Sequence, residues 1–246
     1  MIIGSVIEHH EKVSSTNAVA VLKIRNEKPC EGTIVTALFQ EKGRGQMGNA
    51  WESEAGKNLL MSVILYPEMI IAENQFILSK MVSVAVYDLI RNETSDVKIK
   101  WPNDIYVKDD KIAGILIENA VLGNAISSCI AGIGLNVNQK KFISGAPNPV
   151  SLSIVTGKNY ECQQLLEDLA HLLDERYNMI MQGKGDRLSE DYLQALYRRG
   201  EWHRYTDDRG EFTGMIEYVK PDGMLVIRMK NGSSKEYAFK EIEYIL

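Results

Sequence analysis

A glycine-rich loop that contains one arginine is the first stretch of this sequence whose residue types could do chemistry. Residues 43–51 read Gly-Arg-Gly-Gln-Met-Gly-Asn-Ala-Trp and follow a β-prone segment. Three glycines in six residues let backbone N–H groups approach an anion, and Arg44 could add a bidentate contact to a carboxylate or phosphate. A plain structural turn explains a single glycine-rich loop equally well, so the rest of the chain must decide.

Two lysines and an acid come together further along the chain. Residues 100–104 read Lys-Trp-Pro-Asn-Asp, and residues 111–118 read Lys-Ile-Ala-Gly-Ile-Leu-Ile-Glu. A short hairpin would bring Lys100, Asp104 and Lys111 together, which suits chemistry on an anionic substrate. The alternative is a solvated hairpin with ordinary surface charges.

A third motif, Gly-Ile-Gly-Leu-Asn-Val-Asn at residues 132–138, ends an apolar segment with glycines and amides. Such a stretch can face a ligand closely, because glycine has no side chain to keep it away. It can also simply turn the chain.

The pattern of apolar residues predicts the elements that must position these motifs. Apolar residues at steps of three and four predict amphipathic helices over 75–91 and 163–181. Asp109-Asp110 and Gly123-Asn124 have the composition of hairpin turns, which implies antiparallel pairing and a mixed or antiparallel sheet. The β-prone segments that would form this sheet are 33–40, 58–66, 98–100, 105–108, 112–118 and 125–137.

The composition changes after Gly200. Short strands are predicted at 213–219, 224–229 and 236–239, with turns at Pro221-Asp222-Gly223 and Asn231-Gly232. We therefore predict an α+β fold with two domains, a larger one over 1–199 and a small all-β one over 200–246.

Composition and charge exclude several classes of protein. The 246 residues carry a formal charge of −5 and no dense Lys/Arg run, so we expect no nucleic-acid partner. No apolar run approaches the roughly 20 residues of a membrane span, and the N-terminus has no secretory signal, so we expect a cytoplasmic protein without a membrane partner. The three cysteines and four histidines are scattered, which argues against a metallohydrolase or a serine hydrolase.

Taken in order, the motifs resemble those of the biotin protein ligase family. The resemblance begins with Ser15-Thr16-Asn17 and Gln40, and continues through the glycine-rich loop and the Lys-Trp-Pro-Asn-Asp, Lys-x-Ala-Gly-Ile and Gly-x-Gly-x-Asn elements. It implies a mixed, largely antiparallel sheet flanked by helices, similar to class II aminoacyl-tRNA synthetases, followed by an SH3-like β-barrel. It also implies an ATP-dependent ligase that makes biotinyl-5'-AMP and passes the biotin to a lysine of a biotin carboxyl-carrier protein domain.

The resemblance also assigns roles to individual residues. Lys111 corresponds to the family's essential lysine, which stabilises the negative charge that builds up on the α-phosphate. Arg44 would lie near the reacting carboxylate and phosphate, and Trp51 would face the ligand. Magnesium is expected with ATP, and Asn103 or Asp104 could help to hold it. Our hypothesis for Asp104 is that it orients or deprotonates the acceptor amine. The resemblance places Ser15, Thr16, Asn17 and Gln40 at biotin, and Gly43, Gly45, Gly48, Lys100, Asn103, Gly114, Leu116, Gly132, Gly134 and Asn136 around biotin and nucleotide.

The sequence departs from the family in two places. The family loop commonly reads Gly-Arg-Gly-Arg-x-Gly-Arg-x-Trp, whereas Gln46 and Asn49 stand at the second and third arginine positions here. We therefore expect the adenylate to be held less firmly. The family's repressor members carry a DNA-binding domain ahead of the catalytic one. Because the Ser15 motif begins near residue 1, we expect no such domain and no DNA partner.

Two other functions remain open at this point. A lipoate or octanoate ligase shares the fold and also acylates a lysine of its acceptor protein. Its pocket, however, would need no set of polar residues to bind a polar ring. A non-enzymatic biotin or nucleotide sensor belongs to a different class, and Lys111 beside Asp104 argues against it. The sequence leaves the oligomeric state open.

Overall fold

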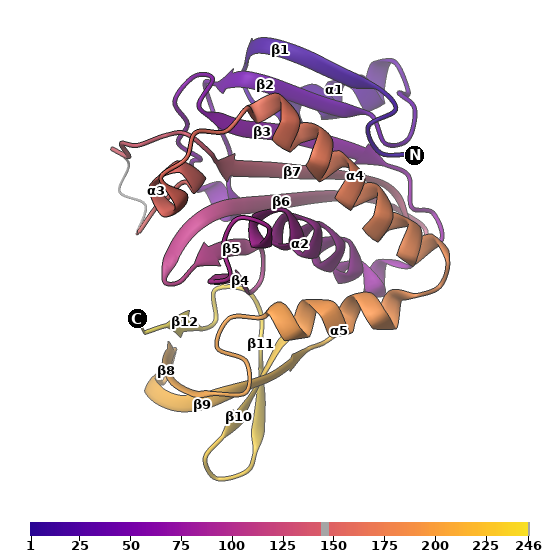
Figure 1. The fold of residues 1–246 in the computed structure, drawn as a ribbon. Helices are drawn as coiled ribbons and strands as arrows, with labels where there is room; N and C mark the ends of the chain where they lie inside the picture. Colours follow the sequence, from indigo (N-terminus) through magenta and orange to yellow (C-terminus); the bar gives the residue numbers. More distant parts are fainter. Residues whose placement is uncertain (144–147, 246) are drawn as a thin grey trace.

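A seven-stranded sheet forms the centre of the larger part of the molecule (Figure 1). The structure is a computed structural model that describes residues 1–143 and 148–245. The strand order is β1-β2-β3-β7-β6-β5-β4. Within the described residues, β1 and β2 pair in parallel and every other neighbouring pair in this sheet is antiparallel. The strands are β1 Ile7–Val13, β2 Ile34–Gln40, β3 Asn58–Leu65, β4 Val97–Lys100, β5 Asp104–Val107, β6 Asp110–Leu122 and β7 Ala125–Asn136.

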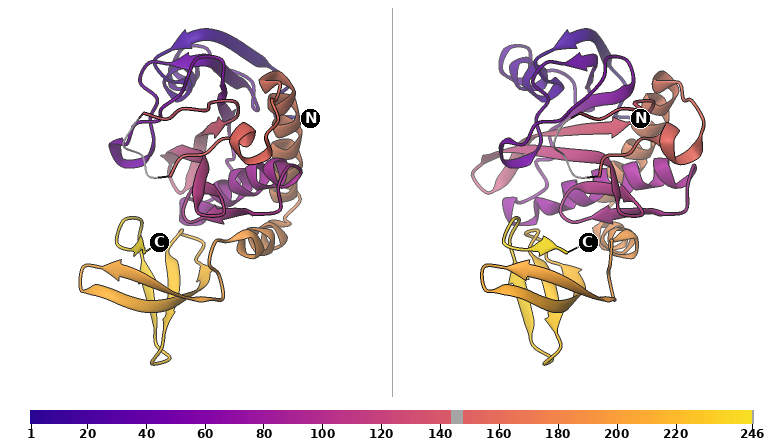
Figure 2. Two further views of the ribbon diagram at one scale, coloured as in Figure 1. Left: turned by 60° about the vertical axis from the view of Figure 1, so that its left-hand side comes forward. Right: turned by 90° about the vertical axis from the view of Figure 1, so that its left-hand side faces the viewer.

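Helices cover both faces of this sheet. On one face α1 (Thr16–Asn26) packs Ala20 against a small cluster of Val35, Ile64 and Ile130. On the other face α2 (Phe76–Arg91) and α4 (Cys162–Met181) close the main core (Figure 2). β3 is buried along its whole length because both of its faces are covered. Short elements complete this part: α3 Leu152–Thr156, α5 Gly185–Ala195 and the 3-10 turns Gln46–Gly48 and Ala72–Asn74.

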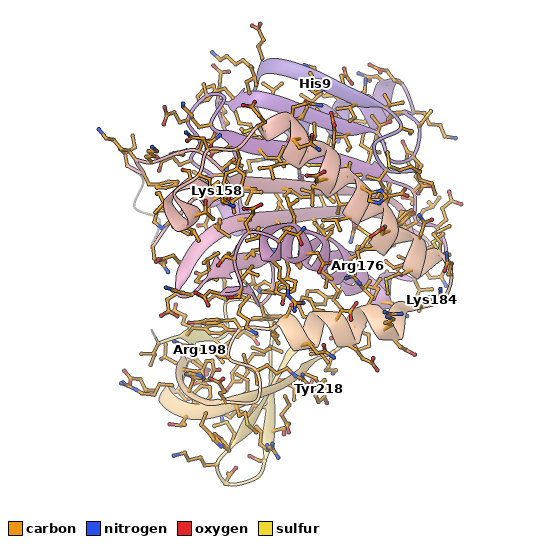
Figure 3. All side chains as sticks on the ribbon, in the orientation of Figure 1. His9, Lys158, Arg176, Lys184, Arg198 and Tyr218 are labelled. Atoms are coloured by element: carbon orange, nitrogen blue, oxygen red, sulfur yellow. The ribbon has the colours of Figure 1, made fainter. Side chains whose placement is uncertain are left out.

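One arginine ties the three longest helices of the main face together. Arg176 of α4, labelled in Figure 3, binds Asp88 of α2 at 2.6 Å and also binds Asp191 of α5. Because two carboxylates share one half-buried guanidinium, the helices are held at fixed positions behind the sheet. No helix in the described residues is both long and apolar enough to cross a membrane.

A second, five-stranded antiparallel sheet follows α5, with strand order β11-β10-β9-β8-β12. Trp101 connects the two sheets: its indole Nε1 donates to Gly223 O at 2.9 Å, and its ring meets Phe239 edge-on. This junction brings the end of the second sheet beside the Lys-Trp-Pro-Asn-Asp motif. The strands are β8 Trp202–Asp207, β9 Gly210–Val219, β10 Leu225–Met229, β11 Ser234–Tyr237 and β12 Glu243–Tyr244.

The predicted fold class is confirmed, and both long helices lie within a residue or so of their predicted limits. The turn predicted at Asp109-Asp110 lies one residue earlier in the structure. Val107 pairs with Asp110, so Lys108 and Asp109 form the turn, with Lys108 at φ 54°. The domain limits at 199 and 200 stay a prediction.

β1, α3, α5, β8 and β12 were not predicted from the sequence. β1 lies at the edge of the sheet and reads Ile-Glu-His-His-Glu-Lys-Val, and α5 is rich in polar residues. The edge strand β1 therefore carries little apolar alternation, whereas α5 buries Leu188, Tyr192 and Ala195 on one face, and this amphipathic pattern was not recognised in the sequence.

Lys80 is a buried cation of the core, and we expect Lys80→Met to stabilise the fold. The side chain is 6% exposed, and its amine bonds only the Ser189 hydroxyl, at 3.1 Å, among the described residues. Burial lowers the pKa of the Lys80 amine. Replacing a buried charge with an apolar side chain of similar length should raise the free energy of unfolding by about 1–2 kcal/mol at pH 7.

The pH dependence follows from the direction of that pKa shift. Between the lowered folded-state pKa and the ordinary value of about 10.4, the unfolded chain binds more protons, so wild-type stability rises with pH. The advantage of Lys80→Met is therefore full at pH 7 and shrinks towards pH 10. Urea unfolding at both pH values measures it, with exposed Lys98→Met as the control. A destabilised Lys80→Met variant would contradict the prediction.

Candidate active site

A cleft of about 570 Å³ opens where the large sheet, the glycine-rich loop and the end of the second sheet meet. Four cationic side chains and two carboxylates face it, so the cleft favours an anionic ligand. Those charges belong to Arg44, Lys100, Lys111 and Lys240, and to Asp104 and Glu243. Of the residues singled out from the sequence, the cleft is lined by Ser15, Thr16, Asn17, Gln40, Arg44, Gly45, Trp51, Lys100, Asn103, Asp104, Lys111, Gly114, Leu116, Gly132 and Gly134.

The register of the sheet explains why motifs far apart in sequence meet here. Lys100 pairs with Asp104, Asp104 with Gly114, and Gly114 with Gly134. Residues that are directly opposite on neighbouring strands point to the same face of a sheet. These four residues of β4, β5, β6 and β7 therefore form one row across the sheet floor.

Gly114 and Gly134 in this row have no side chains, so they leave a bare patch of backbone, the glycine floor of the cleft. Trp51 of the loop lies on this floor. A Cβ at Gly134 would come 2.5 Å from Trp51 Cε2, and a Cβ at Gly114 would come 2.9 Å from Trp51 Cζ3. Glycine is therefore required at both positions while the indole lies there. Trp51 Nε1 is buried and has no hydrogen-bond partner among the described residues, so it is a donor that a ligand or a water could use.

Lys111 stands beside this floor. Its Nζ lies 2.7 Å from Asp104 Oδ1 and 5.8 Å from the centre of the Trp51 ring. Its backbone is fixed as well, because Lys111 N donates to Asn148 O at 2.8 Å. The ammonium is thus held at one place in the cleft, where it can stabilise charge that develops on a bound phosphate.

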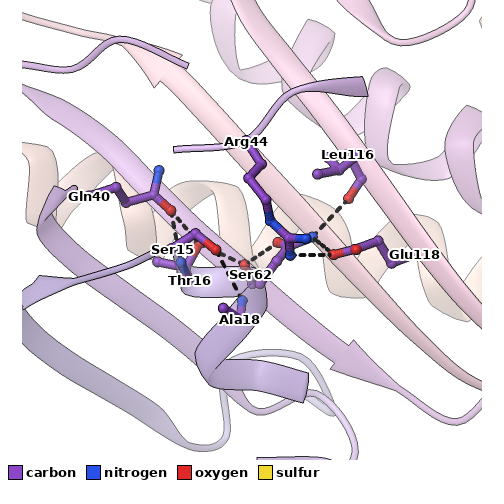
Figure 4. Close-up of polar contacts among 9 residues, drawn as sticks. Ser15, Thr16, Ala18, Gln40, Arg44, Ser62, Leu116 and Glu118 are labelled. Atoms are coloured by element: carbon purple, nitrogen blue, oxygen red, sulfur yellow. Dashed lines mark hydrogen bonds and ion pairs between the residues drawn. The ribbon is translucent and has the colours of Figure 1, made fainter. Parts of the chain in front are cut away.

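A polar cluster forms the other end of the cleft (Figure 4). Ser15 is the N-cap of α1, because its Oγ accepts from Ala18 N at 3.1 Å. Thr16 donates to Gln40 Oε1 from its backbone N at 2.8 Å and from its hydroxyl at 3.1 Å. Thr16 and Asn17 are each under 5% exposed, yet both face the cleft.

Ser62 completes this cluster and was missed in the sequence. It is fully buried in β3, and its hydroxyl lies within hydrogen-bond distance of two oxygens, Thr16 Oγ1 at 2.7 Å and Asn17 Oδ1 at 2.6 Å, to one of which it donates its single proton. Ser62 pairs with Gly132, and a Cβ at Gly132 would come 2.2 Å from Asn17 Oδ1. Its signal in the sequence was a single hydroxyl within the otherwise apolar segment 59–65.

The end of the second sheet forms a wall that the sequence did not predict. Lys100 Nζ bonds Tyr106 Oη at 3.0 Å and lies 4.9 Å from the Tyr244 ring centre. Burial, with a contribution from nearby Lys111, lowers the pKa of Lys100. Lys100 is therefore held partly by aromatic rings of β5 and β12, so β12 helps to shape this end of the cleft. This wall consists of Phe239, Lys240, Ile242, Glu243 and Tyr244.

Four residues predicted for the site either lie outside the cleft or have side chains that bond within the protein. Asn103 is buried, and its Nδ2 donates to Ile115 O at 2.5 Å. This bond connects the turn between β4 and β5 to β6. Gly43, Gly48 and Asn136 are not among the described residues that line the cleft. Gly43 closes the loop, because its O accepts from Trp51 N at 2.9 Å. Gly48 has φ 84°, and Asn136 Nδ2 donates to Val150 O at 3.0 Å.

The chain belongs to the Biotin/lipoate A/B protein ligase family, whose model matches residues 10–138. It is 30% identical over 203 residues to a biotin–[acetyl-CoA-carboxylase] ligase of Paracoccus denitrificans, covering 79% of this chain and 83% of the relative. It is 29% identical to the bifunctional ligase/repressor BirA of Bacillus subtilis, covering 96% of this chain and 74% of that protein.

Among solved structures, the fold is shared with the biotin protein ligase of Aquifex aeolicus in complex with biotin and ATP. The TM-score is 0.80 at 24% identity, and the alignment covers 97% of this chain and 98% of that one. This likeness shows that the fold of the two sheets and their helices is that of a solved biotin protein ligase.

Proposed function

We propose that this protein is an ATP-dependent biotin protein ligase. It makes biotinyl-5'-AMP and pyrophosphate, then transfers biotin to a lysine of a biotin carboxyl-carrier protein domain. The observation that carries the choice of biotin is the buried polar cluster of Thr16, Asn17, Gln40 and Ser62 at one end of the cleft. A polar ring needs such partners, since each buried group left unpaired costs roughly 1–3 kcal/mol.

The first half-reaction joins the biotin carboxylate to the α-phosphorus of ATP. A carboxylate oxygen attacks, the bond to the bridging oxygen breaks, and pyrophosphate leaves. Lys111 is the residue best placed to stabilise the added negative charge, with Arg44 as the loop's only arginine nearby. The bare glycine floor and the Trp51 indole would hold the planar parts of the ligand.

The second half-reaction forms the amide. The neutral amine of the acceptor lysine attacks the acyl carbon of the mixed anhydride, and AMP leaves with the electron pair of the broken bond. The proton of the amine must be taken up, and the Asp104 carboxylate in the cleft can accept it. The ion pair with Lys111 keeps Asp104 in place for this step.

Magnesium fits this cleft with a limited set of ligands. The ion prefers oxygen ligands and usually combines one or two carboxylates with substrate phosphates and water. Asp104 supplies a charged carboxylate, whereas Asn103 is buried at 8% exposure and offers only a neutral amide oxygen. Asp104 is therefore the better candidate of the two, and a bound ion would offset the charge of the leaving pyrophosphate.

Mass spectrometry of a purified biotin carrier domain tests the proposal. The domain is incubated with the protein, ATP, magnesium and either biotin or lipoate. We expect a biotin-sized mass gain that requires ATP. A gain with lipoate alone would assign the protein to the other branch of its family. Binding of biotin without any ATP-dependent labelling would favour the sensor.

A further inference from the structure

Glu118 is the acidic residue that closes the polar cluster. It lies on β6, and its Oε2 accepts from Asn17 Nδ2 at 2.6 Å and from Arg44 Nη2 at 3.2 Å (Figure 4). It therefore connects α1, the glycine-rich loop and the sheet through one oxygen. The role proposed above for the cleft does not use it.

The contact with Glu118 determines which way the Asn17 amide points. A carboxylate only accepts hydrogen bonds, so the Asn17 NH₂ group must face Glu118. The amide oxygen is then on the opposite side, where it accepts from Ser62 Oγ at 2.6 Å and lies directly over Gly132. An amide oxygen has two lone pairs, and Ser62 uses one. The other can accept from an N–H group of a ligand.

Arg44 explains why an acid is tolerated at the edge of a cleft for anions. Its guanidinium balances the charge of Glu118, whose side chain is 35% exposed. A neutral amide in place of Glu118 would remove the charge and would leave the more distant Leu116 carbonyl, which accepts from Asn17 Nδ2 at 3.5 Å, as the remaining constraint on Asn17. Glutamine offers an oxygen or an NH₂ group at the same place, so either orientation of Asn17 could be satisfied.

We propose that Glu118 is a positioning residue that fixes the Asn17 amide with its oxygen presented to the polar ring of the ligand. The inference rests on the proposed function, since biotin supplies the ring N–H groups. It makes Glu118 a determinant of biotin affinity through Asn17.

Isothermal titration of biotin into the purified full-length protein tests this role. We expect Glu118→Gln to weaken the Kd for biotin by about tenfold, the effect of one charge-controlled hydrogen bond. Its melting temperature should stay close to that of the wild type. Glu27→Gln is the matched control, because it removes an exposed carboxylate that binds Lys23 at 2.7 Å, away from the cleft.

A double-mutant cycle with Asn17→Ala separates positioning from a general structural effect. If Glu118 acts through Asn17, adding Glu118→Gln to Asn17→Ala will cause no further loss of biotin affinity. Additive losses, or an unchanged Kd in Glu118→Gln, would overturn the inference while the wild type still binds biotin. Absence of biotin binding by the wild type would overturn the proposed function and the inference with it.

Discussion

Lys111→Ala will lower the rate of adenylate formation by about 10²–10³-fold. The Lys111 ammonium is the cation that the sheet fixes beside the bare glycine floor, 2.7 Å from Asp104. Without it, the charge that builds on the α-phosphate loses a preorganised partner. Single-turnover formation of biotinyl-5'-AMP, followed by mass spectrometry, measures the change.

Asp104→Asn is the matched control for Lys111→Ala, because it breaks the same ion pair but keeps the ammonium. We expect it to lower the adenylation rate less than Lys111→Ala does, because the asparagine amide oxygen can still ligate magnesium, and to slow the transfer of biotin from preformed adenylate. Equal adenylation by Lys111→Ala and wild type would refute the role of Lys111. Unchanged transfer by Asp104→Asn would remove Asp104 as the acceptor of the proton.

The sequence predicted the parts of this site that carry their signal locally. The glycines of 43–51, the pair Gly132 and Gly134, and the charges of 100–104 stand out by residue type and spacing. The hairpin turn at Gly123-Asn124 pairs Leu122 with Ala125, but an irregularity between Ala120 and Val121 then shifts the β6–β7 register by one residue and places Gly114 opposite Gly134. The turn alone would have placed Gly114 opposite Ile133, so this row could not be predicted from the turn residues.

The residues that were missed depend on contacts between distant segments. In the sequence Ser62 is one small polar residue within an apolar strand. Its place in the site becomes clear only from its hydrogen bond to Thr16, at the start of a helix 46 residues earlier. Glu118 gains its role only when Asn17, 101 residues away, reaches it. Tyr244 faces Lys100 because the second sheet folds back against the Trp101 junction. No local pattern encodes such pairings.

Gln46→Arg will slow the release of the adenylate by about tenfold. Gln46 and Asn49 both line the cleft, so the two positions at which the family commonly has arginine do face the ligand here. Gln46 Oε1 is buried and has no hydrogen-bond partner among the described residues. The Gln46 amide can donate to a phosphate only through its neutral NH₂ group, whereas a guanidinium offers donors with a full charge. A charge-assisted bond exceeds a neutral one by about 1–2 kcal/mol, which corresponds to a factor of ten or more.

Release is measured by loading the protein with labelled biotin and ATP, then chasing with an excess of unlabelled biotin. Gln194→Arg adds the same charge on an exposed position of α5 and should leave the release rate unchanged. If both variants slow release equally, the effect would come from net charge rather than from the loop. If neither does, the amides at 46 and 49 hold the intermediate as well as arginines would, and retention must depend on Arg44, Lys111 and the Trp51 floor.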